Sequence, residues 1–292
     1  MAGLLTFTSD FGTEDSYVAE VKGVLKALDS EIQVIDITHW VKPGNLTAAS
    51  FVLLHAFRYF PTGTTHLAVI DPGVGSERDI LAVRTETFLF IGPDNGVLHE
   101  AVTAAGGGTI FALDTERFLR TLQAVYPENE VAMRIVEQGP SSTFHGRDLF
   151  APFSAYLLGG HPIREVARQK ETMIKHEIMR PAVNADRLQG RIVYIDRFGN
   201  LISNIEARMV GQQDEIFLKS GESVTLVGKL KRSYASAGQG VPLAIAGSRG
   251  LLEIAVSGGS AKEHFKASYG DDVLVLKKQE SGGEHLRRLR MP

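Results

Sequence analysis

The spacing of apolar residues changes along this chain of 292 residues, and this change constrains the fold more than any other feature. In the first half, apolar runs such as Leu4–Thr8 alternate with segments such as Asp15–Leu28, where apolar side chains recur at helical spacing. Apolar strands that alternate with helices are typical of a largely parallel sheet covered on both faces. Beyond about Arg187 the apolar runs are short and separated by Gly and Ser, as in a small β-barrel or β-sandwich.

We therefore predict an α/β fold with two domains. An N-terminal α/β domain with a mainly parallel sheet is expected over residues 1–180, and a smaller, all-β, barrel-like C-terminal domain over residues 186–280, with a polar tail at 281–292. The chain length suits two domains. From about residue 159 to residue 187, the pattern loosens into a polar connection.

The expected elements follow from these patterns. Periodicity and β-propensity predict strands in the first half at Leu4–Thr8, Ile32–Ile37, Thr65–Ile70, Ile80–Thr85, Phe88–Ile91 and Thr109–Leu113. Helices are predicted over Asp15–Leu28, from an Asn45 cap to Pro61, and over Leu149–Leu158. Strands in the second half are predicted at Arg191–Ile195, Ser223–Val227, Leu243–Ala246, Leu251–Val256 and Val273–Leu276.

Composition argues against several classes of function. The net charge of −3 gives no broad attraction to nucleic acid or to anionic membranes, and the basic run at Arg287–Arg290 is best interpreted as a solvated tail. The chain contains no cysteine, which excludes disulfides, thiolate metal sites and cysteine nucleophiles. Neither a signal peptide nor an apolar run of membrane-spanning length is evident. We expect a cytoplasmic protein with no nucleic-acid and no membrane partner.

Polar turns follow three of the predicted strands, at Ser9–Gly12, Asp71–Arg78 and Pro93–Gly96. Ligands of open α/β sheets bind at the carboxyl ends of strands, where such loops converge. A further turn at Thr143–Asp148 contains a histidine. If the fold brings these turns together, Asp71, Arg78 and His145 would form a charged, metal-free pocket that holds and orients a small oxygen nucleophile.

Each of these residues also has a purely structural interpretation. Asp71 belongs to a common Asp-Pro-Gly turn, Arg78 could pair with a surface carboxylate, and His145 could be a core histidine. For Arg147 and Asp148 a local ion pair or a helix N-cap is favoured over catalysis. Asp10, Asp71, Asn95 and His145 could instead be ligands of a hard metal ion, although no metal-binding spacing supports this alternative.

Two motifs of the second half could hold a polar ligand. The sequence Asp196-Arg-Phe-Gly-Asn200 places a carboxylate, an aromatic ring and an amide within five residues at the end of a strand. Such groups can fix an amino-acid-like or nucleoside-like molecule, but a β-turn with a left-handed Asn explains them equally well. The sequence Ala246-Gly-Ser-Arg-Gly-Leu251 lies further along the chain.

Together, these motifs resemble those of a known family in the same order. The matching segments are Ser9–Gly12, the Tyr17-Val18…Lys22-Gly23 helix, Asp71–Ser76, Pro93–Gly96, Phe144–Asp148 and Asp196–Asn200. The chain resembles the S-adenosylmethionine hydroxide adenosyltransferases, or S-adenosylmethionine hydrolases, which are relatives of the fluorinases and chlorinases. The resemblance spans nearly the whole chain.

The resemblance implies a reaction in which water or hydroxide attacks C5′ of S-adenosyl-L-methionine and releases adenosine and L-methionine. It places the catalytic Asp–Arg–His triad on Asp71, Arg78 and His145. S-adenosyl-L-methionine is then the substrate, and no cofactor and no metal are implied. The resemblance also implies a homotrimer whose active sites lie between the N-terminal domain of one subunit and the C-terminal domain of its neighbour.

The same resemblance assigns further ligand-binding residues. Asp10 is expected to bind the ribose hydroxyls, and Asn95 is proposed as a ligand-binding residue from its motif alone. The methionine portion is expected at Asp196, Phe198, Asn200 and Ser248.

The related halogenases are the main alternative. They resemble this chain but carry tyrosines where Asp71 and His145 stand, and the serine by which the fluorinase holds its halide is replaced by Gly146. A metal-dependent hydrolase and a non-catalytic sensor of an adenosyl ligand are further alternatives. Of the triad, His145 is slightly favoured as the proton acceptor.

Overall fold

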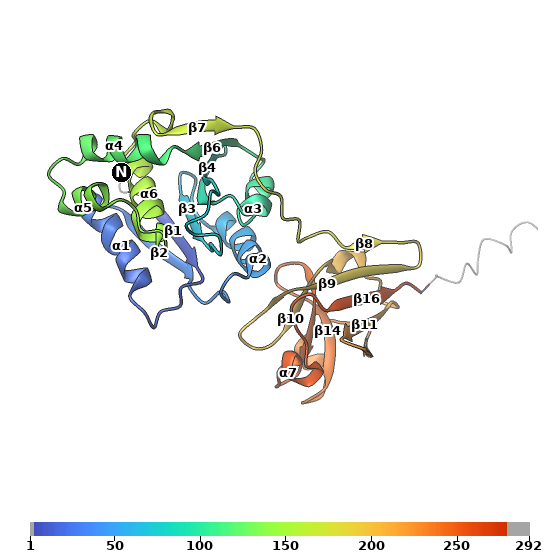
Figure 1. The fold of residues 1–292 in the computed structure, drawn as a ribbon. Helices are drawn as coiled ribbons and strands as arrows, with labels where there is room; N and C mark the ends of the chain where they lie inside the picture. The colour runs from blue at the N-terminus through green and yellow to red at the C-terminus, as the bar shows by residue number, and fades with distance from the viewer. Residues whose placement is uncertain (1–2, 279–292) are drawn as a thin grey trace, which may run out of the picture. The chain divides into compact units, whose positions relative to one another are not determined.

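The computed structural model describes residues 3–278, which form two compact units divided between Ile178 and Met179 (Figure 1). The first unit is mixed α/β and the second is a barrel-like sheet, so the predicted fold class is confirmed. The predicted polar tail at 281–292, including Arg287–Arg290, lies outside the described residues.

The first unit is built on a seven-stranded sheet in the order β2-β1-β3-β5-β4-β6-β7. Its strands are β1 (Leu4–Ser9), β2 (Gln33–Thr38), β3 (Thr65–Val69), β4 (Ile80–Arg84), β5 (Leu89–Pro93), β6 (Thr109–Leu113) and β7 (Ala167–Lys170). Strands β2, β1, β3 and β5 are parallel, whereas β4, β6 and β7 add antiparallel pairs. The predicted hairpin is the β4–β5 pair.

Helices cover both faces of this sheet (Figure 1). They are α1 (Tyr17–Leu28), α2 (Leu46–Ala56), α3 (His99–Ala104), α4 (Thr115–Val125), α5 (Glu130–Gln138) and α6 (Ala151–Leu158). Helix α1 packs against α5 and α6, and α2 packs against α3. The predicted Asn45 cap is confirmed, because its side chain accepts a hydrogen bond from the Ala48 amide at 3.0 Å.

Strand β1 lies between β2 and β3 and runs parallel to both, with five of its six residues buried. The carboxyl ends of neighbouring parallel strands lie at the same edge of a sheet. The turn that follows β1 and the turn that follows β3 therefore begin side by side. This edge carries Asp10 and Asp71.

Two parts of the first unit differ from the sequence-based expectation. Residues 167–170 lie within the predicted polar connection but form strand β7, which pairs with β6 at the edge of the sheet. Helices α3, α4 and α5 were not predicted, although α4 and α5 each have a polar N-cap, Asp114 and Asn129. Both helices are short and amphipathic, and they complete the helical layer beside α1.

The second unit is a nine-stranded sheet in the order β12-β11-β16-β9-β10-β15-β14-β13, with β8 paired to β9. Strand β12, at one end of this order, contacts β14, which is next to the other end. The sheet therefore nearly closes into a barrel. Its strands are β8 (Ala182–Val183), β9 (Arg187–Ile195), β10 (Leu201–Glu206), β11 (Glu215–Ser220), β12 (Ser223–Gly228), β13 (Leu230–Lys231), β14 (Pro242–Ala246), β15 (Leu251–Val256) and β16 (Asp272–Leu276), and its helix is α7 (Ala261–Phe265).

Each unit has its own hydrophobic core. In the first, apolar side chains of the central strands pack against α1 and α6, and in the second the inward-facing residues of the barrel strands pack together. No helix among residues 3–278 is long and apolar enough to cross a membrane.

The core of the first unit also contains a histidine. His66 of β3 is fully buried and stacks on Phe90, with ring centroids 5.1 Å apart. One hydrogen bond of 2.8 Å joins its Nδ1 to Thr6 Oγ1. Burial lowers the pKa of His66 to about 4, because the charged ring would lose its water. His66 is therefore neutral in the folded protein at neutral pH.

This histidine predicts an acid-sensitive stability. Its pKa is lower in the folded chain than in the unfolded chain, so its contribution is complete above pH 6.5 and is lost as the pH falls towards 4. We expect a loss of about 3 kcal/mol in the free energy of unfolding from this group. Denaturant titrations at pH 7, 5.5 and 4 should show a flatter pH dependence for His66→Asn, which cannot titrate. Equal pH dependence in both proteins would contradict the prediction.

Candidate active site

Asp71 and Arg78 form a nearly buried ion pair at the carboxyl edge of the first sheet. Arg78 Nε donates to Asp71 Oδ1 at 2.8 Å and to Oδ2 at 3.0 Å, and Arg78 Nη2 also donates to Oδ2. The side chains of Asp71 and Arg78 are only 6% and 11% exposed. The alternative in which Arg78 pairs with a surface carboxylate is therefore wrong. The guanidinium also lies over the ring of Phe150, 5.5 Å from its centroid.

His145 completes this group. Arg78 Nη2 donates a hydrogen bond to His145 Nδ1 at 2.9 Å. A guanidinium has no acceptor, so Nδ1 must accept and the neutral ring carries its hydrogen on Nε2. Burial lowers the pKa of His145, and the positive charge of Arg78 lowers it further. The turns predicted to meet do meet, while the catalytic role of the three side chains stays a prediction.

A glycine allows the two turns to approach. Gly75 has a φ of 79°, and a Cβ at this position would overlap the carbonyl oxygen of Ser142. The turn that carries Asp71 and Arg78 therefore lies directly against the backbone before His145. On the other side, Phe144 packs edge-on against Phe11, with ring centroids 5.7 Å apart.

Asp10 lies at the same edge, in the turn after β1. Its carboxylate accepts a hydrogen bond from the Gly44 amide at 2.8 Å. Burial raises the pKa of Asp10, the hydrogen bond from Gly44 opposes this, and the negative charge of Asp71 adds to the rise. The electrostatic coupling of Asp10 and Asp71 follows from their positions after neighbouring parallel strands.

Asn95 supports the turn that carries Asp71. Its Nδ2 donates to the carbonyl oxygen of Ile70 at 2.8 Å, and its Oδ1 accepts from the Val97 amide at 3.2 Å. Asn95 thereby fixes the residue immediately before Asp71. These bonds indicate a structural role in the turn, and a ligand contact by Asn95 stays a prediction.

Other residues that support the site were not found from the sequence. Lys170 of β7 bridges Asp79 at 2.7 Å and Asp94 at 2.6 Å, and these acids are the direct neighbours of Arg78 and Asn95. The sequence distances are 91 and 76 residues. No local signal connects residues so far apart, and the bridge depends on the pairing of β7 with the sheet.

His39 supports the Asp10 turn in a similar way. Its Nδ1 shares a hydrogen bond with Ser9 Oγ at 2.7 Å, its Nε2 lies 3.1 Å from Asp36 Oδ1, and its carbonyl accepts from the Gly12 amide at 2.7 Å. Burial lowers the pKa of His39, against the raising effect of Asp36.

The predicted pair Arg147 and Asp148 is an ion pair, with Arg147 Nε donating to Asp148 Oδ1 at 2.6 Å. The N-cap interpretation of Asp148 is wrong, because this residue lies inside a π-helical turn, Gly146–Phe150, that leads into α6. Its carboxylate instead accepts from the Ser141 amide at 2.9 Å. The pair also extends beyond its own turn, since Arg147 Nη1 donates to Glu20 of α1 at 2.9 Å.

In the second unit, the four predicted ligand residues line one pocket of about 690 Å³: Asp196, Phe198, Asn200 and Ser248. Asn200 Nδ2 donates to Asp196 Oδ2 at 2.8 Å, and Asp196 Oδ1 accepts from the amides of Phe198 and Asn200. The ring of Phe198 is 77% exposed, which leaves its faces available for contact.

The pocket also has lining residues that the sequence reasoning passed over. Arg249 and Glu253 line it together with Tyr234, whose hydroxyl donates to Glu253 at 3.4 Å. Burial raises the pKa of Glu253, and the negative charge of Asp196 adds to the rise. Arg249 directly follows Ser248 in the motif already noted, so that motif contained the signal.

In the described part of the chain, no three His, Asp or Glu side chains are gathered where they could hold a metal ion. The hard-metal alternative drawn from the sequence therefore has no geometric support among these residues.

Comparison with known proteins gives a consistent result over most of the chain. Residues 5–167 match the family model of the SAM hydroxide adenosyltransferase N-terminal domain, and residues 190–274 match that of the C-terminal domain. The (R)-S-adenosyl-L-methionine hydrolase of Thermus thermophilus is 35% identical over 92% of this chain and 98% of its own length. That of Methanocaldococcus jannaschii is 32% identical over 94% and 95%.

More distant similarity extends to a halogenase, and the fold matches a solved structure. A fluorinase of an Actinoplanes species is 25% identical over 94% of this chain and 97% of its own length. The crystal structure of an uncharacterized conserved protein from Thermotoga maritima matches with a TM-score of 0.79 and 30% identity, over 94% of this chain and 100% of that one. On the two domain matches and the identity to the hydrolases, the chain belongs to the SAM hydroxide adenosyltransferase family.

Proposed function

We propose that this protein is an S-adenosyl-L-methionine hydrolase that forms adenosine and L-methionine. The observation that carries the proposal is the nearly buried group in which Arg78 joins Asp71 to His145. The names of the relatives support the same activity.

In this reaction the leaving group departs readily, and the difficult part is to activate and orient the nucleophile. An oxygen of water forms a bond to C5′ as the C5′–S bond breaks, and the bonding pair moves to sulfur, which becomes the neutral thioether of methionine. Water loses one proton. Because a sulfonium leaves readily, the enzyme has to hold a weak nucleophile in line with the breaking bond, which is worth several kcal/mol.

The hydrogen-bond pattern supports a distinct role for each side chain of the triad. His145 Nδ1 is occupied by Arg78, so the free ring nitrogen presents an N–H to the water. Asp71 keeps unused lone pairs and is the acceptor available for the proton. This geometry does not support His145 as the proton acceptor, because a second proton would place a cation against Arg78. Arg78 donates hydrogen bonds to both Asp71 and His145 and so fixes their relative positions.

A partly dry site suits this chemistry. As the proton of water moves towards Asp71, the attacking oxygen becomes hydroxide-like. Its attack on a cationic sulfonium reduces charge separation in the transition state, and exclusion of bulk water strengthens this effect. The small exposure of Asp71 and Arg78 is consistent with such a site.

The remaining predicted residues provide substrate-binding groups. Asp10 is proposed to bind the ribose hydroxyls, since its carboxylate lies at the same edge as the triad and is coupled electrostatically to Asp71. In the second unit, the pocket formed by Asp196, Phe198, Asn200 and Ser248 is proposed to hold the methionine portion. Asn95 is proposed to hold the backbone of Ile70, the residue before Asp71.

Two observations favour hydrolysis over halide transfer. Asp71 places a carboxylate in the nucleophile site, which repels halides but accepts a hydrogen bond from water. A Cβ at Gly146 would lie 3.1 Å from the Phe11 ring and 3.2 Å from the Phe144 ring. These rings leave little room for the serine hydroxyl by which the fluorinase is expected to hold its halide.

Three finer features belong to this proposal. The chain is proposed to act as a homotrimer with active sites shared between subunits, and to work in the cytoplasm without a metal or other cofactor. Sedimentation velocity tests the first, and full activity after exhaustive chelation tests the absence of a metal.

The first prediction concerns the products and the substrate isomer. Incubation of the protein with S-adenosyl-L-methionine in ¹⁸O-water should place the label on the 5′ oxygen of adenosine, with one methionine per adenosine by mass spectrometry. The names of the relatives lead us to expect faster turnover of the (R)-sulfonium epimer than of the (S)-epimer.

Other outcomes would point to the alternatives. A chlorinated or fluorinated nucleoside formed in the presence of the halide would support a halogenase. Tight binding without methionine release from either epimer would support a sensor.

The second prediction concerns the pH dependence of turnover. Because burial and Arg78 lower the pKa of His145, the neutral ring persists below pH 6.5. We expect kcat/KM to fall on the acid side, with a midpoint below pH 6.5, as protonation breaks the Arg78 contact. In His145→Gln, which cannot titrate, this acid limb should disappear while some turnover remains.

Substitution of the triad provides the matching control. His145→Ala and Asp71→Asn should each lower turnover at the pH optimum by at least about tenfold. The triad assignment fails if neither does.

A further inference from the structure

Among residues 3–278, the His145 side chain makes one hydrogen bond. Its ring accepts a hydrogen bond from Arg78, and in the described part of the chain no other hydrogen bond of this ring is found. The position of the imidazole therefore depends on the backbone that carries it. What holds residues 144–148 in place decides whether His145 reaches Arg78.

That backbone begins an irregular helical turn. Residues Gly146–Phe150 form a π-helical turn, closed by a hydrogen bond from the Ala151 amide to the Gly146 carbonyl, and regular α6 follows. Single π-turns are uncommon and are frequent at functional sites. The hydrogen bonds of this widened turn differ from those of regular α6, so the turn is not simply an extension of that helix. It therefore needs support from side chains.

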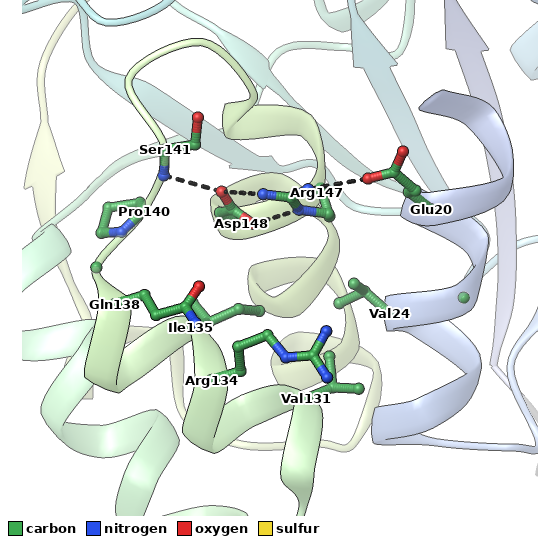
Figure 2. A pocket seen from close by; sticks show the side chains of 12 residues that line it. Glu20, Val24, Val131, Arg134, Ile135, Gln138, Pro140, Ser141, Arg147 and Asp148 are labelled. Atoms are coloured by element: carbon green, nitrogen blue, oxygen red, sulfur yellow. Dashed lines mark hydrogen bonds and ion pairs between the residues drawn. The ribbon is translucent and has the colours of Figure 1, made fainter. Parts of the chain in front are cut away.

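An ion-pair clamp, defined here as Glu20, Arg147 and Asp148, provides this support (Figure 2). Arg147 Nε and Nη2 donate to the two oxygens of Asp148 at 2.6 and 3.0 Å, while Nη1 donates to Glu20 Oε2 at 2.9 Å. Both carboxylates are thus bound by one planar guanidinium, which joins the π-turn to α1. Glu20 is itself fixed by a hydrogen bond from Ser16 at 2.6 Å.

The clamp also holds the segment before His145. Asp148 Oδ2 accepts from the Ser141 amide at 2.9 Å, and the Arg147 guanidinium lies over the Phe144 ring, 5.1 Å from its centroid. The backbone on both sides of His145 is therefore tied to the same three side chains. Asp148 is only 5% exposed, so its carboxylate oxygens are bonded by these partners rather than by bulk water.

The clamp forms one wall of a cavity of about 580 Å³ beside α1 and α5. Arg134 of α5 lines the same cavity but is exposed, and no hydrogen bond or ion pair of its guanidinium is found within residues 3–278. Figure 2 shows Arg134 beside the clamp, with no dashed line to it. It provides a matched arginine that leaves the clamp intact.

We propose that Glu20, Arg147 and Asp148 are positioning residues that hold His145 against Arg78, an inference that rests on the proposed hydrolase function. The partners of Arg147 are Asp148, Glu20 and the Phe144 ring, so it acts on His145 through the backbone of the π-turn. A lysine in its place keeps the charge but cannot bind both carboxylates in the same planar arrangement.

The first test is kinetic. Arg147→Lys should lower kcat about tenfold with KM changed less than twofold, and Glu20→Gln should lower kcat by a smaller factor. In a His145→Ala background, neither change should lower kcat further, because the side chain that they position is absent. Arg134→Gln should leave kcat unchanged.

Additivity would overturn the proposal. If Arg147→Lys lowers kcat by the same factor with and without His145, the clamp acts on overall stability or on another group. Unchanged kcat in Arg147→Lys would overturn it as well. Glu20 is partly exposed, so Glu20→Gln provides the same comparison if Arg147→Lys folds poorly.

The second test does not need turnover and therefore separates this proposal from the proposed function. The ¹⁵N shifts of the His145 ring report which nitrogen carries the hydrogen. The charged groups that face this ring are Arg78, Asp71 and Asp148. The unsubstituted protein should show hydrogen on Nε2 with Nδ1 accepting, and Glu20→Gln or Arg147→Lys should show a mixture of tautomers. Identical shifts in all three proteins would overturn the proposal, whether or not the protein is a hydrolase.

Discussion

The site of this protein depends on one guanidinium that contacts two different partners. Arg78 binds both oxygens of Asp71 and still has an N–H for His145 Nδ1. A lysine has no planar set of donors with which to make this arrangement. The bond to His145 fixes the tautomer of its ring, and the bonds to Asp71 orient its carboxylate. One side chain therefore determines which donors and acceptors the triad presents. The surrounding structure brings three turns to within reach of it.

The parallel sheet accounts for much of that arrangement. Strands β1 and β3 are neighbours, so Asp10 and the Asp71 turn emerge at one edge. The antiparallel additions matter as well, because β7 carries Lys170 to the acids that flank Arg78 and Asn95. Two irregular segments then complete the site. Gly75, with a positive φ, lets its turn lie against the backbone of Ser142. The π-turn after His145 is joined to α1 by the Glu20–Arg147–Asp148 clamp.

The chain therefore has two polar centres of different character. In the first unit, charges are paired and nearly buried, which suits the activation of a small nucleophile. In the second unit, Asp196 and Asn200 form a hydrogen-bonded turn beside the exposed Phe198 ring, and together these line an open pocket that suits a larger polar molecule. Both centres lie within the segments that match the SAM hydroxide adenosyltransferase family models, residues 5–167 and 190–274.

The sequence by itself determined the fold class, most strand positions and the turns that carry the candidate residues, because hydrophobic periodicity and turn chemistry are local properties. It also contained the motifs that the family shares. Local patterns missed helices α3, α4 and α5 and strands β7, β10 and β11, since the stability of such short elements comes mainly from packing against the rest of the unit. Only the tertiary structure decided that Arg78 binds Asp71 rather than a surface acid, that His145 presents Nε2–H, and that Arg147 reaches Glu20, 127 residues away. The reason is physical: a hydrogen bond depends on distances of about 3 Å, and spacing along a chain does not encode them.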